Sequence, residues 1–373
     1  MIKQVAVNNI LLNGNEKEYI KQCIDTGWIS GEGLFIDRFE KEFSQYIGRS
    51  YGVAVSNGSA ALDIAVLAAG VGEGDEVIMP TFTIISPALS VVRAGAIPVL
   101  VDSDPVTWNM DVSQIERKIT SKTKAIIVVH IYGLPVKIDE VLELAKKYDL
   151  KVIEDAAEMH GQTFRGKKCG TFGDISTFSF YANKVITTGE GGMILCDDAG
   201  VAARCRKLRN LAFEPGGPRF VHYEMGYNYR MTNMQAALGI AQLEQIEILL
   251  SKKLLIGKYY NQKLNFLSKY GYQLPTQSTA YAENIYWIYG LIAPDEEEKN
   301  KIVKHLNEQK IGNRPFFWCM HEQPVFKKMN LFKGEQYPVA ERLARNGFYI
   351  PGGCGLTEEE LETVSKAISQ FYG

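Results

Sequence analysis

The chain has 373 residues, enough for about two or three domains that each bury a hydrophobic core. Its 41 basic and 43 acidic residues give a formal charge of −2 without long blocks of one sign, so nucleic acid and anionic membranes are not expected partners. Hydrophobic residues make up 46% of the chain, which excludes a disordered protein and removes the need for a disulfide framework.

Several features exclude export and metal binding. The most apolar stretch, residues 83–101, is interrupted by Ser86, Pro87, Arg93 and Pro98, and falls short of the roughly 18 uninterrupted apolar residues of a membrane-spanning helix. The N-terminus has neither a basic leader before an apolar core nor a small-residue cleavage site. The six cysteines are scattered, without a C-x-x-C pair or nearby histidines at ligand spacing. We therefore expect a cytoplasmic protein with reduced, mostly buried cysteines and no metal site.

From about residue 50 to residue 200, short β-branched apolar runs alternate with segments of helical period. The runs predict strands at 51–55, 76–79, 97–101, 125–129, 151–154, 175–180 and 192–196. The helical period predicts helices at 60–69, 112–119 and 140–147. Strands that alternate with crossover helices form a largely parallel sheet covered on both faces. We predict a large α/β domain over residues 1–250.

The C-terminal third has a different pattern. Residues 232–267 form one long apolar-periodic stretch without proline, which predicts a helix or a helix pair that leads out of the large domain. A strand candidate follows at 285–292, then an amphipathic helix at 296–309 and a terminal helix at 358–371. These elements predict a smaller α+β domain over residues 251–373.

Open α/β sheets bind ligands beyond the carboxyl ends of their strands, and three polar segments lie at such places. The first is Ser56–Ala60, which follows the strand at 51–55 and opens a helix. Its small residues leave backbone N–H groups free at a helix N-terminus, where a phosphate is favoured. The alternative is that Asn57 or Ser59 merely caps the helix.

The second segment is VIEDAAEMHG, in which a buried-type strand ends at Asp155. A carboxylate at that point faces the crevice and needs a cationic partner to stay charged. The alternative is that Asp155 caps a following helical turn, and taken alone the two interpretations are nearly even.

The third segment, TFSFYANKVITTGEGG, places Lys184 between a strand and a glycine-rich loop. A lone lysine in such a context is more often a surface residue. Here a lysine amine that can form a Schiff base occurs with a carboxylate on an adjacent strand and a phosphate-type loop. Pyridoxal phosphate requires these three groups, because the carboxylate keeps the pyridine nitrogen protonated and the ring then acts as an electron sink. Phosphate-loop, dinucleotide, nucleophile-elbow and zinc-protease motifs are absent from the sequence.

The chain resembles the DegT/StrS family of pyridoxal-phosphate-dependent nucleotide-sugar aminotransferases. The resemblance rests on four strings, VSNGSAALDIAVLAAGVGEGDEVIMP, VIEDAAEMHG, GTFGDISTFSFYANKVITTGEGGMI and GYNYRMTNMQAALGIAQLE. It implies a fold-type-I aminotransferase, with a mostly parallel sheet covered by helices and a smaller C-terminal α+β domain. It also implies a homodimer with shared active sites.

The resemblance implies roles for individual residues. Lys184 would hold the cofactor as a Schiff base and then move the proton between cofactor and substrate, while Asp155 pairs with the pyridine nitrogen. The other cofactor contacts that it implies are Gly58, Ser59 and Ser179 at the phosphate, Glu158 near the ring hydroxyl, and Asn228 at the phosphate of the neighbouring subunit. At the position where the family commonly stacks an aromatic residue on the ring, this chain has Ile84, so stacking there is weaker.

The implied substrates are an amino donor, taken as L-glutamate, and a 4-keto-6-deoxy sugar on a nucleoside diphosphate. A GDP-linked 4-keto-6-deoxymannose is the first choice and a UDP-linked sugar the alternative. Candidates for binding this acceptor are Arg230, Arg314 and His321, although Arg230 could instead cap a helix and His321 could pack on Trp318. A non-catalytic regulatory protein on the same fold is the second hypothesis, which the pairing of Lys184 with Asp155 disfavours.

Overall fold

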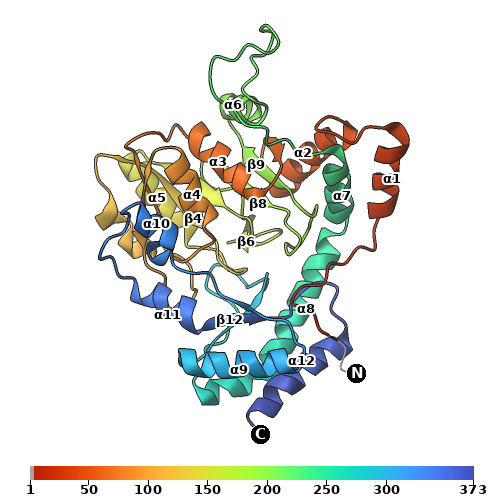
Figure 1. Ribbon diagram of the computed structural model, residues 1–373, viewed down its shortest axis with the longest axis vertical. Helices are drawn as coiled ribbons and strands as arrows, with labels where there is room; N and C mark the ends of the chain where they lie inside the picture. Colours follow the sequence, from red (N-terminus) through yellow and green to blue (C-terminus); the bar gives the residue numbers. More distant parts are fainter. Residues whose placement is uncertain (1–3) are drawn as a thin grey trace.

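The computed structural model describes residues 4–373. A seven-stranded sheet with helices on both faces forms the larger part, and a three-stranded sheet with its own helices lies below it in the view of Figure 1. This arrangement confirms the predicted fold class, an α/β large part with a mostly parallel sheet and a smaller α+β part.

The large sheet contains all seven strands predicted from the apolar runs. In spatial order they are β1 (Tyr51–Val55), β9 (Gly192–Cys196), β8 (Ile175–Ser179), β5 (Lys151–Asp155), β4 (Thr123–Val129), β2 (Glu76–Pro80) and β3 (Ile97–Val101). Only β9 runs antiparallel to its neighbours in this sheet. Central strands buried on both faces need apolar residues at successive positions, which explains the nearly continuous apolar runs in the sequence.

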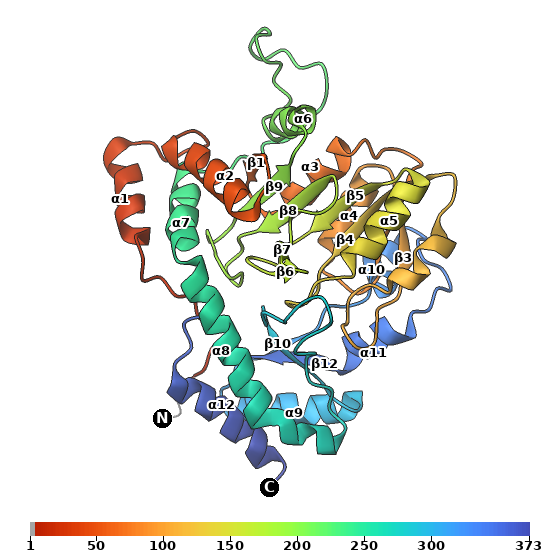
Figure 2. The ribbon, with the colours of Figure 1, turned by 180° about the vertical axis from the view of Figure 1, so that it is seen from behind.

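Helices cover the two faces of this sheet and one of its ends. The helices against the sheet include α3 (Gly58–Ala68), α4 (Ser86–Arg93), α5 (Ile138–Tyr148) and α6 (Ala199–Arg209). Beside β1, two further helices, α1 (Glu16–Thr26) and α2 (Leu34–Ile47), pack on α7 (Asn233–Glu244) (Figure 2). A short hairpin, β6 (Thr163–Phe164) and β7 (Lys167–Lys168), lies apart from the sheet.

The helix predicted at 112–119 does not form. Two 3₁₀ turns occupy it, η1 (Val112–Gln114) and η2 (Glu116–Lys118). Asp111 accepts hydrogen bonds from the backbone N–H and the hydroxyl of Ser113 and from the side chain of Gln114. Such local side-chain bonds favour a tight turn over a continuing α-helix.

The long periodic stretch after residue 232 is a helix pair. It consists of α7 and α8 (Ile246–Leu264), with the 3₁₀ segment η3 (Asn265–Tyr270) after them, and Thr232 and Gln235 form a capping box at the start of α7. Helix α8 runs from the large sheet towards the small one (Figures 1 and 2). Leu249 packs in the main hydrophobic core and Tyr260 in the second core. The predicted division between residues 250 and 251 falls inside this helix and stays a prediction.

The smaller part is an antiparallel sheet of β10 (Tyr289–Ile292), β12 (Gly347–Ile350) and β11 (Arg314–Pro315), packed with α9 (Glu296–Glu308) and α12 (Glu358–Phe371). The strand predicted at 285–292 is only half formed, because Tyr286 has a φ of 52° and its N–H donates to the side chain of Asn284. Val5 bridges to Ile311, so the N-terminal segment packs with the small sheet.

Three short helical segments lie between β11 and β12 and pack against the larger part of the molecule. They are η4 (Met320–Glu322), α10 (Pro324–Lys328) and α11 (Pro338–Asn346). Phe326 and Leu343 from this region belong to the main hydrophobic core. The six cysteines are free and buried, as predicted. Within residues 4–373, no helix combines the length and the apolar character that a membrane span requires.

Candidate active site

A cavity of about 740 Å³ opens beyond the carboxyl ends of β4, β5 and β8, next to the start of α3. The predicted site residues that line it are Gly58, Ser59, Ile84, Asp155, Glu158, Ser179 and Lys184. Their grouping follows from the topology, because parallel strands bring their carboxyl ends to one edge of the sheet. Ile84 is 47% exposed at this cavity, so the wall where the family commonly stacks an aromatic ring is aliphatic and open.

The start of α3 forms a cradle suited to a phosphate. The side chain of Asn57 accepts a hydrogen bond of 2.8 Å from the N–H of Ala60, so Asn57 is the helix cap. Ser59 is not the cap, and its hydroxyl lies 2.7 Å from that of Ser86. A Cβ atom at Gly58 would lie 2.8 Å from Cβ of Ser179, so only glycine lets the helix start approach β8 this closely. Free N–H groups and hydroxyls at a helix N-terminus favour a phosphate.

Asp155 is the last residue of β5 and is 3% exposed. Its carboxylate accepts a hydrogen bond of 3.1 Å from the N–H of Ala157, so the capping interpretation is also partly right. Burial raises the pKa of Asp155 to about 6, against the lowering effects of that hydrogen bond and of Lys184. A ligand with a protonated ring nitrogen would provide the cationic partner that keeps this carboxylate ionised.

Lys184 meets a carboxylate and an aromatic ring inside the cavity. Its Nζ lies 3.9 Å from Oε1 of Glu158 and 3.9 Å from the ring centroid of Trp287. Burial lowers the pKa of Lys184, while the charge of Glu158 opposes that shift. Burial raises the pKa of Glu158, against the lowering effects of Lys184 and of the 2.7 Å hydrogen bond that its Oε2 accepts from the N–H of Tyr132. A buried amine with a lowered pKa is suited to act as a nucleophile and as a base.

Three polar atoms in the cavity wall have no hydrogen-bond partner among the described residues. They are the hydroxyls of Thr83 and Thr177 and the amide oxygen of Asn183. Buried polar groups are nearly always satisfied, so these atoms indicate a polar ligand. Together with the cradle at α3, the carboxylate of Asp155 and the amine of Lys184, they fit pyridoxal phosphate.

Several cavity residues were missed by the sequence interpretation. Thr177 could have been found, because it lies two residues before Ser179 on the same strand and therefore faces the same side. Trp287 and Tyr349 carry no such signal, since they come from segments far from the motifs in sequence.

The predicted substrate residues lie outside this cavity. Arg230 lines a separate cavity of about 800 Å³ and donates to the side chain of Asn210, while Thr232 caps α7 in its place. His321 is 4% exposed, with ring nitrogens hydrogen-bonded to Thr81 and Glu341, and its ring packs on Tyr337 instead of Trp318.

Arg314 lines a recess beside the main cavity, and Asn228 is exposed without lining the cavity of its own chain. In this single chain, the structure therefore does not bring the predicted acceptor residues together. Their roles, like those of the other predicted site residues, stay predictions.

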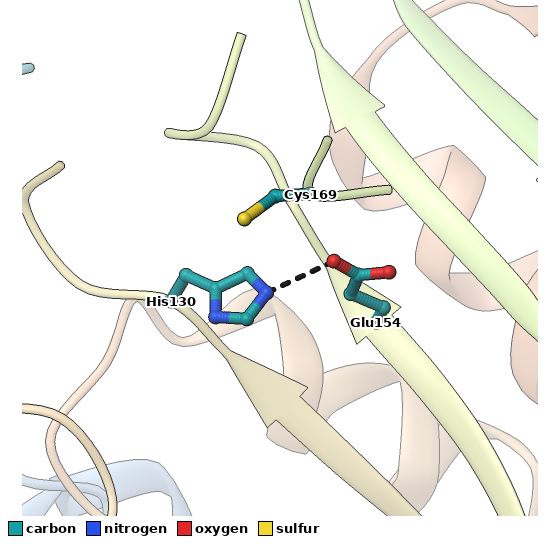
Figure 3. A group of neighbouring side chains, drawn as sticks. All are labelled: His130, Glu154 and Cys169. Atoms are coloured by element: carbon teal, nitrogen blue, oxygen red, sulfur yellow. Dashed lines mark hydrogen bonds and ion pairs between the residues drawn. The ribbon is translucent and has the colours of Figure 1, made fainter. Parts of the chain in front are cut away.

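A buried trio beside the site resembles a metal centre in composition, but its hydrogen bonds point to a structural role. His130 Nδ1 accepts from the N–H of Val136, so Nε2 carries the proton that it donates to Glu154 over 3.0 Å (Figure 3). The oxygens of Glu154 also accept from the N–H groups of Gly170 and Phe172. Hydrogen bonds thus occupy the ligand atoms of His130 and Glu154, and only the thiol of Cys169 would be available to a metal. The trio fixes the loop after β7 against the ends of β4 and β5.

Comparison with known proteins agrees with this chemistry. A model of the DegT/DnrJ/EryC1/StrS aminotransferase family matches residues 11–369. A protein of Escherichia coli O157:H7 named GDP-perosamine synthase is 41% identical over 371 residues, which cover 100% of this chain and 99% of that protein. A protein of the same name from Caulobacter vibrioides is 41% identical over 372 residues, with 99% and 98% covered. The solved structure of an aminotransferase from Psychrobacter cryohalolentis is 28% identical, with a TM-score of 0.90 and 97% of each chain covered.

Proposed function

The chain belongs to the DegT/DnrJ/EryC1/StrS aminotransferase family and is a pyridoxal-phosphate-dependent enzyme. From that membership we propose that it moves an amino group from L-glutamate to C4 of a nucleotide-linked 4-keto-6-deoxy sugar. The best acceptor is GDP-4-keto-6-deoxymannose, and the product is GDP-perosamine. The observation that carries this proposal is the meeting of the buried side chains of Lys184, Asp155 and Glu158 in one cavity. The names of the two 41% identical relatives support the choice of sugar.

In this proposal each residue has a defined task. When bound, pyridoxal phosphate supplies an electron sink that stabilises negative charge at the reacting carbon of the substrate. Lys184 takes the proton from that carbon of the donor and later returns a proton to C4 of the sugar. Asp155 would hold the positive charge on the ring nitrogen, and Glu158 would stand near the ring hydroxyl. Ser59 and Ser179 would hold the phosphate, which would keep the cofactor in place for both substrates.

The regulatory alternative finds no support in these observations. A protein that only binds a ligand has no use for an amine, two carboxylates and a phosphate cradle in one cavity. A cytoplasmic location, which the sequence predicts, fits the proposal because both substrates are charged, water-soluble molecules.

The acceptor preference is the first testable prediction. A free 4-keto sugar is expected to be a very poor acceptor, GDP-4-keto-6-deoxymannose the best and a UDP-linked 4-keto-6-deoxy sugar the second, because the nucleotide provides binding energy that the free sugar lacks. The measurement is kcat/KM for the three acceptors, starting from the amine form of the enzyme. A free sugar or keto acid in first place would overturn the nucleotide-sugar assignment. A UDP sugar in first place would overturn only the choice of GDP.

We also propose that two copies of the chain form a homodimer with shared active sites. Residues 211–226 form an arm that projects beyond α6 (Figure 1) and exposes the apolar side chains of Phe220, Tyr223 and Met225. Exposed apolar side chains of this size on one segment favour a protein partner. Asn228 follows the arm and is exposed, so it is free to reach the phosphate in the other subunit. A reciprocal contact of this kind requires a two-fold axis.

Subunit mixing tests the shared site. Neither Asn228→Ala nor Lys184→Ala should support normal turnover alone. In a hybrid dimer, however, one site has both native residues and the other site has both substitutions. Random exchange makes half of the dimers hybrids, so mixing should restore up to about a quarter of wild-type activity. Turnover is measured after exchange has been verified by mass spectrometry of the dimers. An absence of recovery would place Asn228 in the site of its own subunit.

A further inference from the structure

Lys253 is a buried lysine of α8 to which the proposed reaction gives no task. It is 3% exposed, and no carboxylate forms an ion pair with it among residues 4–373. Removing an ammonium group from water costs free energy, and burial accordingly lowers the pKa of Lys253. Hydrogen bonds are the compensation that the structure provides, so the partners of this group indicate what it does.

The ammonium group of Lys253 joins two segments that flank the small sheet. It donates hydrogen bonds of 2.6 Å to the carbonyl oxygens of Trp287 and Gly352. Trp287 lies two residues before β10, and Gly352 lies two residues after β12. Because Tyr289 pairs with Ile350 in the sheet, both carbonyls lie at the same end of it, and one ammonium group reaches both.

Trp287 connects this end of the sheet to the amine of Lys184. Its ring centroid lies 3.9 Å from Nζ of Lys184, and its Nε1 donates a hydrogen bond of 3.0 Å to the carbonyl of Asn183, the residue before that lysine. Lys253 therefore holds the backbone of Trp287 while Asn183 holds its indole. Lys253 and Lys184 also line the same small recess, so the two lysines are neighbours.

The indole ring limits where the amine of Lys184 can lie. At 3.9 Å, the amine is too far from Oε1 of Glu158 for a hydrogen bond, so the contact with the ring of Trp287 remains to hold it. A lysine side chain is long and flexible, and a displacement of about 1 Å at reacting groups can cost roughly 100-fold in rate. Whatever fixes Trp287 therefore affects the proton transfers that Lys184 carries out.

We propose that Lys253 is a positioning residue, which holds Trp287 in place so that the indole keeps the amine of Lys184 within reach of the reacting carbon. The inference rests on the proposed role of Lys184 and deepens it, because it names the residue outside the cavity on which the position of that amine depends. Lys253 itself touches neither substrate in this proposal.

The test measures the two half-reactions separately in holoenzyme carrying Lys253→Met, which removes the charge and both hydrogen bonds at similar size. At saturating L-glutamate, the rate of the cofactor absorbance change is expected to fall roughly 10- to 100-fold. The rate with amine-form enzyme and the nucleotide sugar should fall by the same factor, because Lys184 acts in both. KM for each substrate should change less than about threefold, since no substrate contact is removed.

Three further variants complete the kinetic test. Lys253→Arg, which keeps the charge and several N–H donors, should restore most of the rate. Lys253→Gln can still donate to one of the two carbonyls, so it should show a smaller loss if Lys253→Met does not fold. Lys258→Met, at an exposed lysine of the same helix, is the matched control.

Two measurements follow the path from Lys253 to Lys184 directly. The N–H of Lys184 donates to the carbonyl of Tyr181, and hydrogen exchange of residues 181–187 in cofactor-free protein should be about tenfold faster in Lys253→Met and unchanged in Lys258→Met. In a Trp287→Leu background no ring is left to position, so adding Lys253→Met should change the half-reaction rates by less than about twofold.

The inference is overturned by any of three results. They are a lower melting temperature with unchanged rates and exchange, a loss confined to one half-reaction, and losses that multiply in the double variant. If no nucleotide sugar reacts while Lys253→Met still slows the reaction with L-glutamate, the inference stands and the proposed acceptor fails. If Lys184→Ala keeps normal turnover, the proposed site fails and the inference fails with it, whatever the exchange rates are.

Discussion

Lys184→Ala is expected to abolish transamination and the yellow absorbance band of a lysine-bound cofactor. The side chain of Lys184 is 10% exposed, and no other lysine lines the main cavity among the residues that the structure describes. No amine is then left either to bind the cofactor or to move the proton. Absorbance spectra and turnover of the purified protein check this, and borohydride should bleach the band only in the wild type.

The matched control for this variant is Lys258→Ala, at an exposed lysine on α8 that should keep both band and turnover. Circular dichroism shows whether Lys184→Ala is folded. A folded Lys184→Ala protein that transaminates at the wild-type rate would refute the assignment of the site.

Asp155→Asn is expected to reduce turnover by about 10²-fold or more while cofactor binding changes little. An amide of the same shape cannot hold a positive charge on the ring nitrogen, so the electron sink is weakened. The cradle formed by Gly58, Ser59 and Ser179 is untouched by this substitution and still holds the phosphate. Cofactor content by absorbance and kcat at saturating donor separate the two effects, and Asp25→Asn on the exposed face of α1 is the control.

The pH dependence of turnover gives a second measurement on the same variant. Burial raises the pKa of Asp155 to about 6, and the positive charge of Lys184 lowers it. A bound cationic ring nitrogen lowers it further, so wild-type turnover should fall on the acid side at or below about pH 6, as Asp155 gains a proton. Asp155→Asn should lose this acid limb. A variant with normal turnover would mean that another residue faces the ring nitrogen.

The large sheet and the centre of the site were readable from local sequence. Each central strand is buried on both faces, so its apolar run marks it without knowledge of its neighbours. The carboxyl ends of such strands meet at one edge of the sheet, which is why the polar residues Asp155 and Ser179, each the last of its strand, line one cavity. The capping of α3 by Asn57 is compatible with the predicted phosphate site, because one side chain satisfies the helix and the neighbouring groups remain free.

Hydrophobic periodicity gave wrong predictions at two places, where short-range side-chain hydrogen bonds determine the backbone conformation. Residues 112–119 have apolar residues at helical spacing, but hydrogen bonds to the carboxylate of Asp111 favour tight turns there. The strand predicted to begin at residue 285 begins only at Tyr289, because the backbone turns at Tyr286. In both places a specific hydrogen bond outweighs a weak propensity.

The outer walls of the site depend on contacts between segments far apart in the chain. Nothing in the sequence around Trp287 shows that its ring will cover Lys184, or that Arg314 will share a recess with Tyr349. The imidazole of His321 could bind a substrate, yet packing places it in the interior between Thr81 and Glu341. Periodicity reports the burial and direction of a side chain within its own element. Which elements meet is set by packing of the two cores and by the path of α8 between them, and that information is spread over the whole chain.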